Sequence, residues 1–472
     1  MPIGASLEVI DCMGGTISPG MVDIQINGGF GVDLSEFTSP IEYLTGLDKL
    51  SEELLRMGVT SYVPTVISQK PEVYKKILPL LMERAGKSPK LGVLSATPLG
   101  FHVEGPFLAP LKKGCHPSEN IAVVNEGLTD FENMYGSEAV APNREMVRIV
   151  TVAPDVQGVL PCIPELSERG ITVALGHTNA TTEQALQGII NGATLLTHIF
   201  NAMPPLHHRD PSIIGLLGLP LHQPTQDLKL LSDAQKVHSA PVTPILTRFK
   251  RLFTMTEPLV EEDESLPDED PVSVPRDTPF LGDKHVKKAC MTCSYDPCDQ
   301  IDGCACEAPS TQQCDPESEG QMASRPSFSI IADGVHVHPQ AVALAYRAYP
   351  EGCILISDAM HFMDPDLPDG VYPWRESAIE KRGMTLTLDG TDTLAGSILP
   401  MPEAVINLSK FADIPLERAI ACATYTPAKL LGGLFKESHG LVPGCKADVL
   451  LWDKEGLKGV WKRGREVWRR SE

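Results

Sequence analysis

Ionisable side chains stand at the ends of several short apolar runs in the sequence. Glu104 ends one run, His177 follows a second, His198 lies within a third, and Asp358 ends a fourth. One carboxylate and two imidazoles suit a catalytic divalent metal, which takes about three protein ligands and leaves a position open for water. Such an ion lowers the pKa of its bound water towards neutrality. The pattern therefore predicts metal-assisted hydrolysis, with Glu104, His177 and His198 as metal ligands.

Each of these residues taken alone also has a structural explanation. A single histidine at a strand end is more often a hydrogen-bonded structural residue than a ligand. Asp358 suits a general base that takes a proton from water and returns it to a leaving amine. It equally suits the N-cap of a helix that follows the strand. The coincidence of residue type and position at four strand ends favours the chemical interpretation, and both roles of Asp358 stay open at this point.

Alternating helix-length and strand-like segments must position these side chains. A helix is expected from about Ile41 to Met57, with Ser39 as its cap and Gly58 as its stop. Strands are expected at 59–65, 147–152, 171–176, 194–200, 328–332 and 353–357, and helices at 182–190 and 339–348. Repeated strand, helix, strand order implies parallel pairing of buried strands. Because polar residues gather at the strand ends, a (β/α)8 barrel is favoured over a doubly wound sheet.

The composition is typical of a soluble globular protein. Hydrophobic residues make up 42% of the chain, and no apolar run approaches the roughly 18 residues of a membrane span. Residues 1–15 lack the basic region and apolar core of a secretory signal, so a cytoplasmic location is expected. The net charge of −21 argues against a nonspecific nucleic-acid binder, which needs a basic surface.

Residues 219–325 interrupt the rhythm of strands and helices with acidic, proline-rich sequence. The part from Glu257 to Gly320 holds 17 acidic and four basic residues. It also holds half of the twelve cysteines, namely Cys290, Cys293, Cys298, Cys304, Cys306 and Cys314. Such sequence buries too little apolar surface to offset its ordering entropy, so we expect a largely disordered insertion. A structural zinc site is an alternative, but the spacing lacks paired Cys-x2-Cys motifs and favours reduced cysteines.

Further short motifs accompany the four residues in order along the chain. They are PGMVDIQINGG at 19–29, HVEGPF at 102–107, KGCHP at 113–117, LGHT at 175–178, THIFNAM at 197–203, HHRDP at 207–211, ADGVH at 332–336, SDA at 357–359 and LAGS at 394–397. In this order they resemble the N-acetylglucosamine-6-phosphate deacetylase branch of the amidohydrolase superfamily. The resemblance covers nearly everything from Ser18 to Trp468 except the insertion. It implies hydrolysis of N-acetyl-D-glucosamine 6-phosphate to D-glucosamine 6-phosphate and acetate.

The resemblance also implies roles for individual residues. Glu104, His177 and His198 correspond to the metal ligands, Asp358 to the catalytic acid/base, and His116 to the residue that polarises the acetamide carbonyl. The implied sugar and phosphate contacts are Cys115, Asn201, Ala202, Arg209, Asp333, Gly334, Val335, His336, Leu394, Ala395 and Gly396. The implied cofactor is one divalent ion per subunit, expected to be Zn²⁺. A homodimer is expected because such an arginine reaches across a dimer interface in the family.

Two amides stand where many amidohydrolases carry a His-x-His pair for a second metal. Here the sequence has Gln25 and Asn27. Neutral amides are poor zinc ligands compared with imidazole. We therefore predict a single catalytic metal. A purely structural role, in which both amides hydrogen-bond to neighbouring strand ends, is compatible with the same conclusion.

The resemblance also predicts the organisation of domains. Residues 19–218 and 326–435 are expected to form the barrel, 219–325 the insertion, and 436–472 the strands of a small β-sandwich. Residues 1–18 are expected to be a remnant of that sandwich, because family members carry several dozen residues before the motif at 19–29. The sandwich strands would then have exposed edges. The insertion is expected to fold away at the surface, to act as a lid, or to obstruct the pocket.

Alternative functions stay open. A relative acting on another N-acylated sugar phosphate, or a dihydroorotase, would use a similar ligand set. The turn at 201–203 with Arg209 and His336 favours a phosphosugar, because Arg209 and His336 suit a phosphate dianion, but it does not specify the epimer. A non-catalytic barrel scaffold is disfavoured, because only chemistry needs Glu104, both histidines and Asp358 together.

Overall fold

The computed structural model describes residues 10–86, 94–142, 146–220, 222–224, 322–375, 377–391, 393–432 and 440–471. All of them belong to one compact unit, made of Met1–His238 and Gly320–Glu472. Most of the acidic segment predicted at 219–325, with its cysteine run, lies outside the described residues, so the expectations for it stay predictions. At its borders, β11 (His222–Pro224) pairs antiparallel with β12 (Met322–Ser324).

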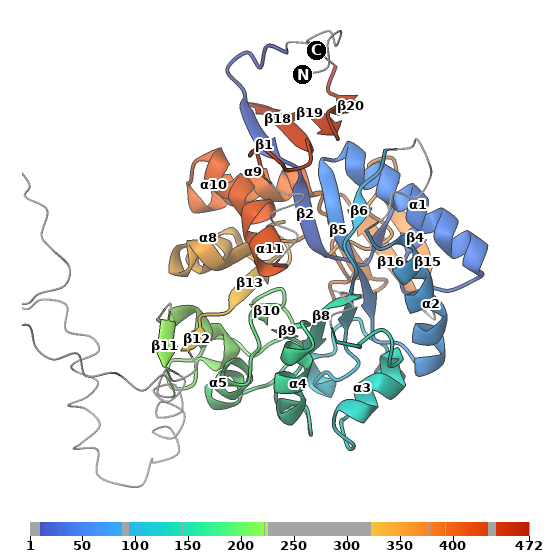
Figure 1. Ribbon diagram of the computed structural model, residues 1–472, viewed down its shortest axis with the longest axis vertical. Coiled ribbons are helices and arrows are strands. Elements are labelled where there is room, and N and C mark those ends of the chain that lie inside the picture. Colours follow the sequence, from blue (N-terminus) through green and yellow to red (C-terminus); the bar gives the residue numbers. More distant parts are fainter. Residues whose placement is uncertain are drawn as a thin grey trace, which may run out of the picture. The chain divides into compact units, whose positions relative to one another are not determined.

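Eight parallel strands form the centre of the fold (Figure 1). In sheet order they are β2 (Met21–Ile26), β5 (Val59–Ile67), β7 (Phe101–Glu104), β8 (Val147–Val152), β9 (Thr172–Leu175), β10 (Leu195–Leu196), β13 (Ser327–Ile330) and β14 (Cys353–Leu355). Every residue of β2, β5 and β8 is buried, as expected for parallel strands covered on both faces.

Backbone hydrogen bonds join the last strand region to the first and close the barrel. The Asp358 amide donates to the Gln25 carbonyl at 2.9 Å, and the Asn27 amide donates to the Ala359 carbonyl at 2.8 Å. The predicted (β/α)8 barrel is thereby confirmed, and closure brings Gln25 and Asp358, distant in sequence, to the same end of the barrel.

Helices follow most of the strands and cover the barrel. They are α1 (Pro40–Arg56), α2 (Pro71–Arg84), α3 (Leu128–Tyr135), α4 (Ile163–Glu168), α5 (Thr182–Ile190), α8 (Pro339–Ala348), α9 (Met401–Ala412), α10 (Leu416–Ala423) and α11 (Tyr425–Leu430). The Ser39 hydroxyl accepts from the Glu42 amide at the start of α1, and Thr181 with Gln184 forms a capping box at the start of α5. Among the described helices, none has the length and apolar character to cross a membrane.

A separate four-stranded antiparallel sheet packs beside the barrel (Figure 1). It contains, in order, β1 (Thr16–Pro19), β18 (Val449–Asp453), β19 (Gly456–Lys462) and β20 (Arg465–Arg469). The buried Lys462 ammonium connects the two parts, donating to the Thr60 carbonyl of β5 at 2.8 Å and to Asp448 at 2.6 Å. The Trp452 indole donates to the Ser18 hydroxyl at 2.9 Å within the sheet. The predicted sheet domain is therefore present.

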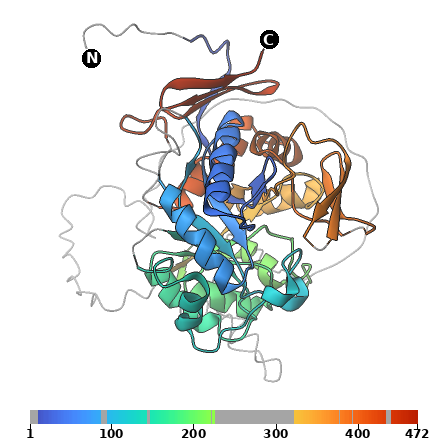
Figure 2. The same ribbon diagram turned by 90° about the vertical axis from the view of Figure 1, so that its right-hand side faces the viewer.

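A three-stranded excursion leaves the barrel after Asp358. It contains β15 (Gly370–Trp374), β16 (Ser377–Arg382) and β17 (Thr385–Leu388), drawn in orange in Figure 2. The chain leaves and returns at one place, because Ala359 and Ser397 form a parallel bridge and the Met360 amide donates to the Ser397 carbonyl at 2.9 Å.

Candidate active site

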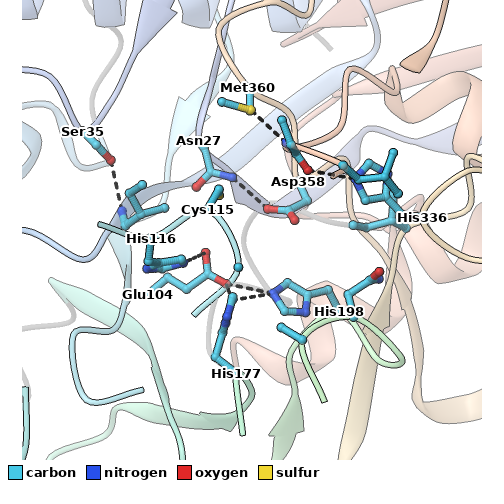
Figure 3. A pocket seen from close by; sticks show the side chains of 18 of the residues that line it. Asn27, Ser35, Glu104, Cys115, His116, His177, His198, His336, Asp358 and Met360 are labelled. Carbon is cyan, nitrogen blue, oxygen red and sulfur yellow. Dashed lines mark hydrogen bonds and ion pairs between the residues drawn. The ribbon is translucent and has the colours of Figure 1, made fainter. Parts of the chain in front are cut away.

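Strand ends supply the four ionisable residues singled out in the sequence. Glu104 is the last residue of β7, His177 and His198 each follow a strand by two residues, and Asp358 follows β14. The φ angles of His177, His198 and Asp358 are 46°, 28° and 46°. L-residues adopt this left-handed region only at an energetic cost. The chain thus leaves strand geometry at these positions, and all four side chains lie in one pocket (Figure 3).

The Glu104, His177 and His198 side chains converge on one point. Glu104 Oε1 lies 3.1 Å from His177 Nε2 and 3.0 Å from His198 Nε2, and the two nitrogens lie 3.0 Å apart. His177 Nδ1 lies 2.8 Å from the Lys112 carbonyl and must donate to it. In neutral His177 the Nε2 lone pair therefore faces the carboxylate. This donor set, with one imidazole oriented by a carbonyl, fits a divalent cation.

Electrostatics favour an ionised Glu104. Burial raises the pKa of this carboxyl, but His177 and His198 outweigh burial and hold the pKa well below its ordinary value. The anionic form is the one that a cation requires. Among the described residues, this is the group of carboxylate and imidazole side chains close enough together to share a metal.

The two amides of the first strand region hold the carboxylates in place. The Gln25 side-chain amide donates to Glu104 Oε1 at 3.0 Å and to Asp358 Oδ1 at 3.2 Å. Asn27 Nδ2 donates to the same Asp358 oxygen at 2.8 Å. Gln25 and Asn27 therefore hydrogen-bond to neighbouring strand ends, which is the structural role considered in the sequence analysis.

Asp358 has the properties of a proton acceptor. Burial and the nearby Glu104 charge raise its pKa to about 6, against the smaller effects of His198 and Asn27. A carboxylate of this kind can take a proton and release it near neutral pH, which efficient general acid–base catalysis requires. Asp358 is not the cap of a helix, since no helix begins at this position.

His116 is fixed as a neutral hydrogen-bond donor. Its Nδ1 lies 3.2 Å from the donating Ser68 amide and 2.7 Å from the Ser68 hydroxyl. An Nδ1 that accepts from a backbone N–H carries no proton, so the proton of the ring is on Nε2. Burial lowers the pKa of His116 well below its ordinary value. The Nε2–H group lies 3.9 Å from Glu104 Oε2, beside the metal-ligand group.

The pocket has a cavity volume of about 190 Å³. It brings together most of the predicted site. The predicted residues that line it are Glu104, Cys115, His116, His177, His198, Asn201, Ala202, His336, Asp358, Leu394, Ala395 and Gly396.

The remaining predicted contacts do not line this pocket. Arg209 lies in an exposed turn, where its own amide donates to His207. Asp333 supports its neighbours instead, accepting from the Val335 and His336 amides at 2.8 Å each. Gly334, with a φ of 75°, forms the turn between them.

His336 is held from both sides. Nδ1 lies 2.6 Å from Asp333 Oδ2, and Nε2 lies 3.2 Å from the Ala395 carbonyl. Since both nitrogens face acceptors, the charged imidazolium satisfies both contacts. Burial lowers the His336 pKa, but Asp333 outweighs burial and raises it above its ordinary value.

Several pocket residues escaped the sequence analysis. They are Asp33, Ser35, Ile67, Gly114, Ile331, Met360, His361, Trp374 and Arg375. Asp33 precedes the first helix, and Arg375 belongs to the excursion after β14, far from the motifs that were considered. Gly114 and Met360 belong to or adjoin quoted motifs, whereas Trp374 and Arg375 lie far from every motif and reach the pocket only through the tertiary fold.

The fold and the site define a class of protein: a (β/α)8 barrel whose strand ends hold a carboxylate and two imidazoles beside an aspartate. The sequence profile of the amidohydrolase family matches residues 16–255, and the chain belongs to this family. Family membership implies a divalent metal, and Glu104, His177 and His198 provide a site for it.

The curated relatives narrow the class. The N-acetylglucosamine-6-phosphate deacetylase of Caenorhabditis elegans is 31% identical, over 97% of this chain and 84% of the relative. The enzyme of the same name from Homo sapiens is 30% identical, over 97% and 85%. A solved N-acetylglucosamine-6-phosphate deacetylase from Pasteurella multocida shares the fold, with a TM-score of 0.65 and 21% identity over 98% of this chain and 90% of that one.

Proposed function

We propose that this chain hydrolyses N-acetyl-D-glucosamine 6-phosphate to D-glucosamine 6-phosphate and acetate. The observation that carries the proposal is one pocket in which Glu104, His177 and His198 converge beside Asp358 and His116. The curated relatives that match nearly the whole chain bear the name of this deacetylase.

The proposed cofactor is one divalent ion per subunit, with Zn²⁺ as the expected metal. When bound, such an ion polarises a carbonyl group and makes water more acidic. Glu104, His177 and His198 would hold it, and mixed carboxylate and imidazole ligands suit zinc. A single ion is proposed because the Gln25 amide already donates to Glu104 and Asp358, and amides are poor ligands.

Two side chains would move or stabilise charge during the reaction. His116 would donate its Nε2–H to the acetamide carbonyl oxygen, where negative charge develops during attack. Asp358 would accept a proton from the attacking water and deliver it to the amine nitrogen as the C–N bond breaks. Burial raises the pKa of Asp358, so the carboxyl can hold the proton between the two halves of this transfer.

The rest of the pocket would bind the sugar and its phosphate. Asn201, Ala202, Cys115 and the loop Leu394, Ala395 and Gly396 line the cavity, together with the charged ring of His336. Arg209 would reach the pocket of a second copy of the chain, because its own turn is exposed and outside this pocket. A homodimer is therefore part of the proposal. The cytoplasmic location expected from the sequence stays a prediction.

N-acetylgalactosamine 6-phosphate is a second candidate substrate. An Escherichia coli O157:H7 relative named for that substrate is 25% identical over 95% of this chain and 87% of the relative. Both epimers carry the same acetamide and phosphate, so both belong in the assay.

The test is acetate release from each epimer by zinc-loaded protein, with Asp358→Asn beside the wild type. We expect turnover of the glucosamine epimer and a loss of kcat of about 10²- to 10⁴-fold in Asp358→Asn. Asp413→Asn is the matched control, because Asp413 has a similar φ of 53° but is an exposed helix C-cap. Absence of turnover by folded, loaded wild type would reject the proposal.

A further inference from the structure

Arg375 lines the pocket and has no role in the proposed reaction. It lies in the turn between β15 and β16, and among the described residues that line the pocket it is the only lysine or arginine. Its φ of 55° places the backbone in the left-handed region. Strained backbone of this kind persists where the surrounding structure enforces it, and it is common at ligand sites.

Packing, and not an ion pair, positions the guanidinium. Its carbon lies 4.7 Å from the ring centroid of the buried Trp374, a stacking contact that orients the planar group. No hydrogen bond or ion pair to a described carboxylate engages the side chain. Its donors are therefore unused by the described residues, although the side chain borders the cavity.

The charge of Arg375 acts on the interior of the pocket. Arg375 lowers the pKa of Asp33, although burial of that carboxyl is the larger effect and leaves the pKa raised. The guanidinium is thus electrostatically coupled to a carboxyl on the pocket wall.

A phosphosugar offers a ligand for such a cation. The substrate carries a phosphate dianion, for which a guanidinium is well suited because it donates two parallel hydrogen bonds. His336 contributes positive charge to the pocket, but both of its nitrogens already face acceptors, Asp333 and the Ala395 carbonyl. Arg209 does not line the pocket of its own chain. Among the described residues Arg375 therefore supplies the available permanent positive charge.

We propose that the Arg375 guanidinium binds the phosphate of the sugar phosphate within its own subunit. The proposal rests on the proposed function for the identity of the substrate. Trp374 acts as a positioning residue, because stacking fixes the plane in which the guanidinium presents its donors.

Binding of glucosamine 6-phosphate and of glucosamine, measured by titration calorimetry on the zinc-loaded full chain, tests the proposal. We expect Arg375→Ala to weaken binding of the phosphorylated sugar about 10- to 100-fold, as the loss of charged hydrogen bonds predicts. Binding of glucosamine should change less than about threefold, since it offers no phosphate to the guanidinium. Arg375→Lys should recover part of the loss, because it keeps the charge but not the fork of donors.

Arg382→Ala is the matched control. Arg382 belongs to the same excursion, but its side chain is 77% exposed and pairs with Glu380, so its removal should leave both affinities unchanged. Equal losses for both sugars in Arg375→Ala, or no loss, would overturn the proposal. Circular dichroism and the melting temperature identify a variant that fails to fold, in which case Arg375→Lys decides the outcome through the same selective loss.

The proposed reaction and the proposed phosphate contact can be contradicted independently of each other. Wild type that binds glucosamine 6-phosphate through Arg375, yet releases no acetate from the acetylated sugar, would contradict the reaction alone. Wild type that releases acetate while Arg375→Ala binds the phosphorylated sugar normally would contradict the phosphate contact alone.

Discussion

At the level of single residues, hydrogen-bond partners determine the form in which each catalytic group is held. The Ser68 amide and hydroxyl fix the proton of His116 on Nε2, and the Lys112 carbonyl leaves His177 Nε2 free to bind a cation. Gln25 and Asn27 supply donors to Asp358 without adding charge. Neutral amide, hydroxyl and carbonyl partners thus orient these groups without adding charge beside them.

Removal of the Ser68 hydroxyl should slow the reaction without weakening substrate binding. Ser68→Ala leaves only the longer backbone contact on His116 Nδ1, so the ring is less well oriented. We expect kcat to fall about fivefold, the equivalent of one ordinary hydrogen bond, with KM unchanged. Ser95→Ala is the control, because the Ser95 hydroxyl is buried without a partner among the described residues. An unchanged kcat in Ser68→Ala would contradict the positioning role.

The charge of His336 should give KM a dependence on pH. Asp333 raises the pKa of His336, so the ring stays charged to higher pH and loses its charge as pH rises through that raised value. Asp333→Asn removes this effect, and the rise in KM for the phosphosugar should begin at lower pH. KM measured from about pH 6 to 9 in wild type, Asp333→Asn and His336→Gln tests this. Identical profiles for wild type and Asp333→Asn would contradict it.

At the level of elements, the strand ends carry the functional geometry. The sequence predicted the strand at 147–152 and the helices at 182–190 and 339–348 as they are observed. The strand predicted at 194–200 is shorter, because His198 leaves strand geometry for the left-handed region. The strand predicted at 353–357 ends at Leu355, three residues before the same change of backbone angle at Asp358. Periodicity of side chains reports burial, but it does not report such a change of backbone angle.

The sequence predicted those residues of the candidate site that belong to recognisable motifs at strand ends. Glu104, His177, His198 and Asp358 stand out because ionisable residues are unusual at the ends of apolar strands, and the structure brings them together. Arg375 did not stand out, because arginines are common in exposed hairpins. Only the tertiary fold places this one at the pocket. Tertiary proximity of this kind is absent from a single sequence.

At the level of the whole molecule, a buried ion pair connects the terminal sheet to the barrel. The Lys462 and Asp448 side chains are 2% and 1% exposed and lie 2.6 Å apart, while Lys462 also donates to the Thr60 carbonyl of β5. Burial lowers the pKa of Lys462, with Asp448 opposing that effect. Stability of the sheet and stability of the barrel are therefore coupled.

Lys462→Met should destabilise the protein strongly without changing the chemistry. The substitution leaves the Asp448 carboxylate buried without its partner, which costs about 3–5 kcal/mol. The midpoint of urea unfolding and the melting temperature should both fall, while kcat at low temperature stays at the wild-type value. Lys462→Met with Asp448→Asn should be more stable than Lys462→Met alone, because no unpaired charge remains. A double variant less stable than the single one would contradict this account.

The bridge between Ala359 and Ser397 has a consequence for the evolution of the protein. The two ends of the excursion meet at the barrel wall, so its length and sequence can vary without moving Asp358 or reopening the barrel. Substrate preference can therefore drift, or be redesigned by grafting another excursion at these two residues, while the hydrolytic centre is inherited unaltered.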